Sequence, residues 1–440
     1  MNSQEFTSIL DKHAAFLAGK PGGVRASFKL ENLTKVNLSH RDLRQADLSG
    51  AKLFGVQMAE SQLTEASLFG ADLRLCNLKK ADLTRADLRG ACMRGATLVD
   101  CIMVEVDLRQ GQLMRRSDAS GEVEQAGNLD RNDGLADLSN VNACNVDLSR
   151  AIGSKTSLMH ADLTDAVMRG ARFDGARMSN AILVGCDMRE MDLTGADLSG
   201  ARLQGATLTG SGLDGAILEN TQLIGAIIDH AELTRANLAG AIMARTLQEA
   251  GINLREVLDQ HGFWVDSVGK RGHRADLMKL DLSGLNLASA NLAAAQLACV
   301  VMRQADLSSA LLAMADLSLS DLRESNFSNA DLRGVNLDRA TLTGAKLARA
   351  QLGPMLIRGP SDQVWSSSLI HTRFDRADLS DSDFTGAGLR NASFCNADLT
   401  RANFTGADLT GADFTGANCH GTNFSGAAMD LARGIRTSVH

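Results

Sequence analysis

The sequence predicts an all-β solenoid, and three observations favour this fold class. A large apolar residue recurs at every fifth position over most of the 440 residues. A small residue, most often Ala, stands two positions before it. Only 4% of the residues are aromatic and none is Tyr, although 44% are hydrophobic. Thick globular cores usually need large rings, so this chain is expected to line a narrow tube with uniform side chains.

The period of five residues defines units, and we call the recurrent apolar residue the centre of its unit. Four runs of centres occupy positions 28–113, 138–243, 277–352 and 369–429. They contain 18, 22, 16 and 13 centres, of which 66 are Leu, Phe, Met or Ile. A regular internal repeat of this kind is typical of a solenoid.

Each unit is predicted to be a short extended piece followed by a turn. The small residue and the centre are two positions apart, so both face inward while the residue between them faces outward. Asp and Asn are common at that outer position, and Ser, Gly and Asn at the last two positions suit a turn. The chain is therefore expected to wind around an axis, with each coil bonded to the next.

Units such as ADLSG at 46–50 and ADFTG at 412–416 resemble the A(D/N)LXX motif of the pentapeptide-repeat family. The resemblance covers 345 of the 440 residues. It implies a right-handed quadrilateral β-helix with four units in each coil.

An alternation of Phe and Leu centres in the last run independently predicts four sides. An odd number of sides would mix Phe with Leu in every column, whereas ladders of like rings are favourable. Four units per coil place the rings in two columns on opposite walls: Phe374, Phe394 and Phe414, and Phe384, Phe404 and Phe424.

Residues 3–18 are predicted to form a helix that caps the first run. Open solenoid ends expose core and unpaired backbone, so they need a cover. Gly19 is typical of a helix end. One helical face collects five residues suited to packing: Phe6, Ile9, Leu10, His13 and Leu17.

A second helical cap is predicted before the third run. Its sequence LDQHGFWVDSVGKRGHRADL at 258–277 parallels LDKHAAFLAGKPGGVRASF at 10–28. Asn253 and Glu256 form a capping-box pattern for its helix. The parallel indicates tandem duplication of a module made of a helical cap and a solenoid.

The duplication predicts two domains, 1–243 and 244–440, and the second opens with a helical cap segment at 244–274. His13 and His261 hold equivalent positions in the two caps. They are expected to pack or to hydrogen-bond there, because no His, Cys or carboxylate partners stand at metal-ligand spacing.

Two interruptions, at 114–135 and 353–366, are the predicted places for partner binding. The separation of Leu113 and Leu138 is a multiple of five, so the phase of the repeat is expected to survive the first, a polar projecting loop. In the second, Trp365 is expected either to cover a coil junction or to anchor a partner. The candidate residues of the first interruption are all charged: Arg115, Arg116, Glu122, Glu124, Asp130 and Asp133.

The sequence offers no catalytic, cofactor or metal-binding motif, and Asp residues before the centres are expected to bond turn backbone. The eight Cys are scattered without a CxxC pair, which indicates reduced thiols. No secretory leader or run of 18 apolar residues is recognised, and a cytoplasmic location is expected.

The leading functional hypothesis is a non-enzymatic scaffold that binds an unidentified cytoplasmic protein. The alternative comes from the family resemblance, which implies modulation of DNA gyrase by mimicry of duplex DNA. Against it, the net charge is only −7, and the most acidic run, 136–243, has 13 acidic and 8 basic residues. The tail at 430–440 is short for a dimerising helix, and the sequence leaves monomer and homodimer open. Direct nucleic-acid binding is not expected.

Overall fold

The computed structural model divides the chain into two compact units. One is Met1–Gln222 with Ile227–Ile242, and the other is Leu223–Ala226 with Met243–His440. The structure describes residues 3–34, 36–111, 114–116, 123–125, 134–358 and 362–435, and the side chains of Ser3 and of 114–116 and 123–125 are outside this description.

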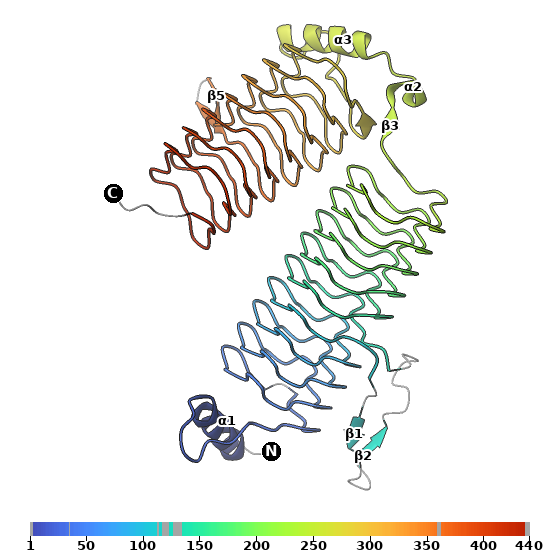
Figure 1. Ribbon diagram of the computed structural model, residues 1–440, viewed down its shortest axis with the longest axis vertical. Coiled ribbons are helices and arrows are strands. Elements are labelled where there is room, and N and C mark those ends of the chain that lie inside the picture. The colour runs from blue at the N-terminus through green and yellow to red at the C-terminus, as the bar shows by residue number, and fades with distance from the viewer. Residues whose placement is uncertain are drawn as a thin grey trace. The chain divides into compact units, whose positions relative to one another are not determined.

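Both units are stacks of coils of 20 residues (Figure 1). Parallel bridges join each outer residue to the one 20 positions later, as in Ser27 with Asp47 and Asp276 with Gln296. Four such columns of bridges run along each stack, which agrees with the predicted four units per coil. The right-handed sense of winding stays a prediction.

The walls of the described residues consist of isolated bridges rather than regular strands, so the all-β fold class stays a prediction at the level of regular strands. The backbone N–H and C=O groups of successive coils bond at each bridge, for example Leu48 N–H to the Ser67 carbonyl at 2.7 Å. The strands in the described residues are two or three residues long: β1 Met114–Arg116, β2 Val123–Gln125, β3 Arg245–Thr246, β4 Leu280–Asp281, β5 Met355–Ile357 and β6 Gln363–Trp365.

A tight turn at each corner explains the small and polar residues at the end of the unit. The carbonyl of the centre accepts from the N–H three residues later, as in Leu48 to Ala51 at 3.0 Å. The last residue of the unit has a positive φ, which is +64° at Gly50 and +56° at Asn140. This conformation favours Gly and Asn, which recur at that position.

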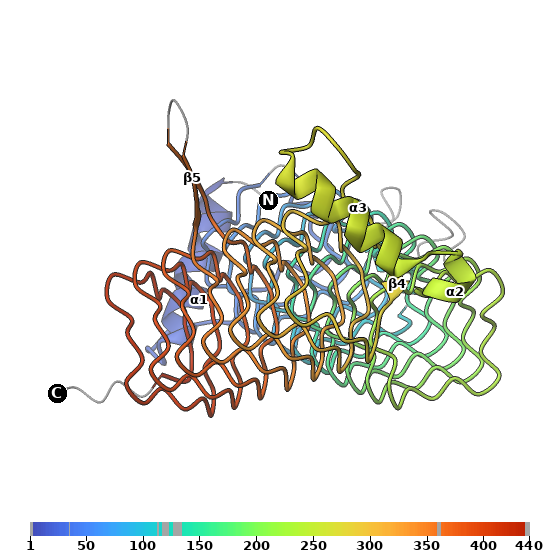
Figure 2. The same cartoon turned by 90° about the horizontal axis from the view of Figure 1, so that it is seen from above.

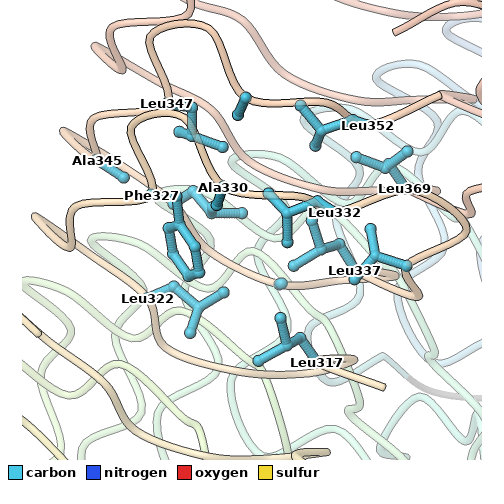
Figure 3. Packing of buried hydrophobic residues seen from close by; sticks show 14 of the residues in the cluster. Leu317, Leu322, Phe327, Ala330, Leu332, Leu337, Ala345, Leu347, Leu352 and Leu369 are labelled. Carbon is cyan, nitrogen blue, oxygen red and sulfur yellow. The ribbon is translucent and has the colours of Figure 1, made fainter. Parts of the chain in front are cut away.

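The centres and the small residues fill the interior of the coils, as Figure 3 shows for part of the second unit. The one Gly centre has a structural reason. A Cβ on Gly153 would lie 2.4 Å from Cε1 of Phe173, the centre directly above it in the next coil. The ring of Phe173 therefore occupies the space that a side chain at 153 would need.

The two predicted Phe columns are confirmed. Phe384 and Phe404 stack with ring centroids 4.7 Å apart, and Phe394 and Phe414 stack at 4.9 Å. Rings of the two columns meet edge to face, as Phe394 and Phe404 do at 5.5 Å and 84°. The tube is therefore narrow enough for opposite walls to touch.

The first interruption preserves the phase of the repeat, but the inserted segment begins earlier in the chain than predicted. Asp87 bridges Asp107, whereas Cys92, one unit later, bridges Asp137. Leu138 therefore follows Leu108 as the next centre of the coil, in the place predicted for Leu113. Leu113 itself lies outside the described residues.

The second interruption shifts the phase. Asn336 bridges Ser368 across it, and this separation is not a multiple of five. From Ser368 onward the bridges return to the regular spacing, as in Ser368 with Gly388. The insertion is therefore confined to one corner of one coil.

Helices cover the first coil of each repeat stack. Helix α1, Ser3–Leu17, packs Phe6 against Phe28 with ring centroids 5.6 Å apart. Gly19 follows it with φ of +63°, as predicted for a helix end. Of the helices in the described residues, none has the length and apolar character needed to span a bilayer.

The second cap segment contains α2, Leu247–Ala250, and α3, Leu254–Asp266. Helix α2 lies within the predicted cap segment 244–274 but was not predicted as a separate helix, and its complete capping box is formed by Thr246 and Glu249. Asn253 caps α3, because its Oδ1 accepts from the Glu256 N–H at 3.4 Å, which is one of the two bonds of the predicted capping box. Strand β3 before α2 pairs in parallel with β4 of the first coil, which fixes this segment to its stack.

Candidate protein-interaction surface

The interruption at 353–366 forms an antiparallel hairpin of β5 and β6 that projects from the coils of the second unit (Figure 2). Met355 lies opposite Trp365, and Leu356 lies opposite Val364. The sequence marked this segment only as an interruption of the repeat, because strands of three residues are too short to show a periodic pattern. We call residues 355–357 with 363–365 the Trp365 hairpin.

Ser367 anchors the base of the Trp365 hairpin to the coil. Its hydroxyl donates to the Gly353 carbonyl at 2.9 Å and accepts from the Gly334 N–H at 2.8 Å. The Ser367 side chain is 1% exposed, so both bonds are shielded from water. A buried, fully bonded hydroxyl holds the two strands in a fixed position on the wall.

Gly334 permits the hairpin to lie close to the wall. A Cβ at this position would be 2.9 Å from Cδ1 of Trp365 and 3.1 Å from Cβ of Met355. Its φ of +69° is also unfavourable for other residues. One edge of the Trp365 indole ring therefore lies against the Gly334 backbone. The covering of a coil junction by this residue stays a prediction.

The Trp365 hairpin exposes large apolar side chains to solvent. Val364 is 65% exposed and Trp365 is 55% exposed, and Leu356 and Ile357 are also exposed. Isolated exposed apolar residues are ordinary, whereas a cluster on one projecting element is typical of a binding surface. The geometry therefore suits both interpretations of Trp365, since one ring edge contacts the coil while over half of the side chain stays open.

The first interruption also contains a hairpin, formed by β1 and β2. Arg115 lies opposite Glu124 and Arg116 lies opposite Val123 in its antiparallel register. The structure thus brings two of the predicted charged residues, Arg115 and Glu124, into one cross-strand pair of backbone positions. Three other candidates, Glu122, Asp130 and Asp133, lie outside the described residues.

Outer Asp residues are held mainly by neighbouring groups of the walls. Asp82 Oδ1 accepts from the N–H of Thr84 at 2.9 Å, a bond that recurs in many units and confirms the predicted turn role. Arg44 binds Asp42 at 2.7 Å. Asp321, 1% exposed, is bound by Arg303 at 2.6 Å and by Arg323 at 2.8 Å.

These contacts also affect protonation. Burial alone would raise the pKa of the Asp137 carboxyl, but bonds from Ser139 and from Arg94, at 2.7 Å, lower it below its usual value. Burial raises the pKa of the Cys76 and Cys101 thiols to about 12. Thiols with such values are not nucleophilic at neutral pH.

Potential metal ligands are dispersed over the two stacks. Within the ranges that the structure describes, no three side chains among His, Cys, Asp and Glu gather closely enough to hold a metal ion. His13 and His261 are far apart in sequence, and each lies buried against its own first coil.

Comparison with known families identifies the repeat. A family model described as pentapeptide repeats matches residues 32–100, 135–210, 213–246, 275–353 and 366–429. These matches cover well over half of the chain. The chain belongs to the pentapeptide repeat family.

Solved structures of other pentapeptide repeat proteins resemble the chain. HetL, involved in heterocyst differentiation regulation in the cyanobacterium Nostoc sp. strain PCC 7120, is 29% identical with a TM-score of 0.37. The match covers 55% of this chain and 97% of HetL. Trypsin-treated QnrB1, a plasmid-mediated fluoroquinolone resistance protein, is 21% identical with a TM-score of 0.30, over 48% of this chain and 86% of QnrB1. No curated protein sequence matches the chain.

Proposed function

We propose that the protein is a non-enzymatic cytoplasmic scaffold that binds a partner protein through the Trp365 hairpin. The observation that supports this most is the exposure of Trp365 and Val364 on an element fixed to the coil by Ser367. Tryptophan residues dominate the binding energy of many interfaces, because a large ring can fill a pocket of the partner.

The fixed base of the hairpin favours binding in a second way. Association loses free energy when flexible segments become ordered, so a segment already held in place binds with a smaller entropic loss. The Ser367 bonds and the close approach to Gly334 supply this order before any partner arrives.

The β1–β2 hairpin is proposed as a charged contact that adds specificity. Arg115 and Arg116 lie on β1, and Glu124 lies on β2. Charged groups at an interface mainly set the association rate and the choice of partner. We expect substitutions here to change the salt dependence of binding more than its dissociation rate.

Photocrosslinking tests the proposal directly. A photoreactive amino acid at position 364 should form a covalent adduct with one partner, and Trp365→Ala should reduce binding of that purified partner by about tenfold or more. Val268→Ser is the matched control, because Val268 is 88% exposed but lies outside the hairpin. Equal binding by the Trp365→Ala and control variants would refute the hairpin as the contact site.

DNA gyrase is the alternative partner, as the family resemblance implies. Mimicry of duplex DNA needs a dense field of carboxylates, whereas wall residues such as Asp321 and Asp42 are bound by Arg. A supercoiling assay with purified gyrase separates the two proposals. A change in supercoiling at micromolar protein would favour gyrase, and no change would exclude it.

A further inference from the structure

The two helical caps are joined to their coils by the same hydrogen bond. His13 on α1 accepts at Nδ1 from the Ala26 N–H at 3.1 Å. His261 on α3 accepts at Nδ1 from the Ala275 N–H at 3.0 Å. Ala26 and Ala275 are the small residues that precede the first centres of their runs, so each bond fixes a cap to the start of a coil.

Other contacts around the two histidines are equivalent as well. An aromatic ring one helical turn later stacks on each imidazole, Phe16 at 6.0 Å and Trp264 at 5.6 Å. The equivalent Arg25 and Arg274 each donate to a backbone carbonyl 20 residues later. Two copies of one arrangement indicate a feature of the capping module rather than an accident of one end.

Each histidine can hold its cap only as the neutral ring. Because Nδ1 accepts a hydrogen bond, the proton of the neutral imidazole is on Nε2. Both side chains are 0% exposed, and neither Nε2 atom has a hydrogen-bond partner among the described residues. A second proton would set an N–H of the ring against the backbone N–H and leave a charge buried.

The charged groups that act on the two rings differ. Burial has the largest effect and lowers the pKa of His13, while Asp42 and the Arg44 carbonyl of the first coil raise it and the charges of Arg25 and Arg44 lower it. Burial also lowers the pKa of His261. There the Ala293 carbonyl raises it and Arg274 lowers it, and no carboxylate of the described residues is among the causes.

We propose that both helices are acid-released caps, in which protonation of His13 and His261 detaches α1 and α3 from their coils. Above pH 6.5, the ordinary pKa of histidine, the rings are neutral whether docked or released. As the pH falls below that value, the released ring binds a proton more readily than the docked ring, so docking weakens until the pKa of the docked ring is reached. The carboxylate of Asp42 favours a charged docked ring and therefore limits this loss for α1, whereas for α3 only the Ala293 carbonyl acts in that direction.

Release would create an apolar surface at the start of each stack. Phe28 is covered by Phe6 of α1, and Leu277 is the corresponding first centre of the second stack. Each histidine also occupies a backbone N–H of the first coil, at Ala26 or Ala275, and such a group can pair with another extended chain when exposed. Acid would thus expose a site for hydrophobic contact and strand addition that is closed at neutral pH. This inference does not depend on the Trp365 hairpin.

Hydrogen–deuterium exchange of the full chain tests the proposal, with rates corrected for the intrinsic effect of pH. Between pH 7.5 and 5.0, the protection factors of the α1 and α3 amides should fall about tenfold for each pH unit below 6.5. The fall should stop once the pH has passed the pKa of the docked histidine. The loss should be at least as large for α3 as for α1, and residues 46–108 should keep their protection. Protection of α1 and α3 that stays constant to pH 5.0 would overturn the proposal.

Substitutions identify the titrating groups. Asn places its Oδ1 near the position of Nδ1 and accepts a hydrogen bond without titrating, so H13N should remove the pH response of α1 alone, and H261N that of α3 alone. H230N, at an exposed histidine, is the control and should change neither response.

A second variant decides the outcome if H13N already weakens docking at pH 7.5. D42N removes the carboxylate that favours the charged docked ring, so it should deepen the loss of α1 protection at pH 5.0 and leave α3 unchanged. An unchanged loss in D42N, or an unchanged response in a well-docked H13N, would contradict the proposal.

Discussion

Single residues show how size is matched across neighbouring coils. Gly153 leaves room for the ring of Phe173, which lies one coil later in the same column. This pairing could have been predicted from the sequence, since four units per coil place the two positions one above the other. The contact of Trp365 with Gly334 could not, because the path of an inserted segment is not set by the repeat.

The interior position of Phe394 predicts a large loss of stability on truncation. Phe394 stacks between Phe374 at 5.3 Å and Phe414 at 4.9 Å and is fully buried. Phe394→Ala should therefore lower the free energy of unfolding by about 3–5 kcal/mol. Urea denaturation followed by circular dichroism measures this. Phe54→Ala, at an exposed ring, is the control, and a similar loss in both variants would argue against the narrow core.

The close approach at Gly334 predicts a local effect on Trp365. In Gly334→Ala, the new Cβ meets an unfavourable positive φ and also clashes with the indole ring of Trp365. Gly386→Ala is the control, because Gly386 also has a positive φ, of +61°, but no atom lies within 4 Å of the new Cβ. In a Trp264→Phe background, only the first variant should change the fluorescence of Trp365. Both should be destabilised by about 1 kcal/mol through the backbone. The same emission in both variants would place Trp365 away from residue 334.

At the scale of elements, the sequence predicts structure where a period is long enough to be seen. Helix α1 and helix α3 each turn an apolar face toward a coil, and their extents agree with the pattern. Helix α2 has four residues and the hairpin strands have three, so no periodicity could reveal them. For the same reason, the sequence indicated a loop at 114–135 and only an interruption at 353–366, where the structure places the strands β1, β2, β5 and β6.

The capping box of α2 predicts the stability of the second cap segment. Thr246 Oγ1 accepts from the Glu249 N–H at 3.2 Å, and Glu249 accepts from the Thr246 N–H at 2.8 Å. Thr246→Ala should reduce protection of residues 247–250 from hydrogen exchange by roughly fivefold, equivalent to about 1 kcal/mol. Ser8→Ala, at an exposed position within α1, should have little effect. Unchanged protection in Thr246→Ala would show that β3 alone fixes this helix.

The hydrogen bonds to Glu249 also predict a pH dependence. Backbone and side-chain bonds from Thr246 lower the pKa of this carboxyl below its ordinary value of 4.5. Its stabilising effect on α2 is therefore present above pH 4.5 and is lost as the pH falls through the lowered pKa. Exchange of α2 amides between pH 6 and 3 should show this loss in the wild type and not in Glu249→Gln.

At the scale of the whole molecule, the repeat accounts for the scarcity of aromatic residues. Leu and Ala fill the coils, and the Phe centres of the last run form two columns. The period of five residues, with four units per coil, predicts which residues of successive coils form bridges. It also predicts that the repeat keeps its phase across the first interruption. Chain length alone cannot show which residues leave the coil, so the sequence could not reveal that Leu138 takes the place predicted for Leu113.

The central claim is that the coils form the framework and the Trp365 hairpin binds the partner. Excision of residues 354–365 joins Gly353 to Ser366 and restores the spacing of five between Leu352 and Leu369. The most direct test measures binding of this variant to the partner identified by crosslinking at position 364. We predict an unchanged circular dichroism spectrum, a melting temperature within about 4 °C of the wild type and loss of binding. Undiminished binding by the folded variant, or loss of the coil structure itself, would contradict the claim.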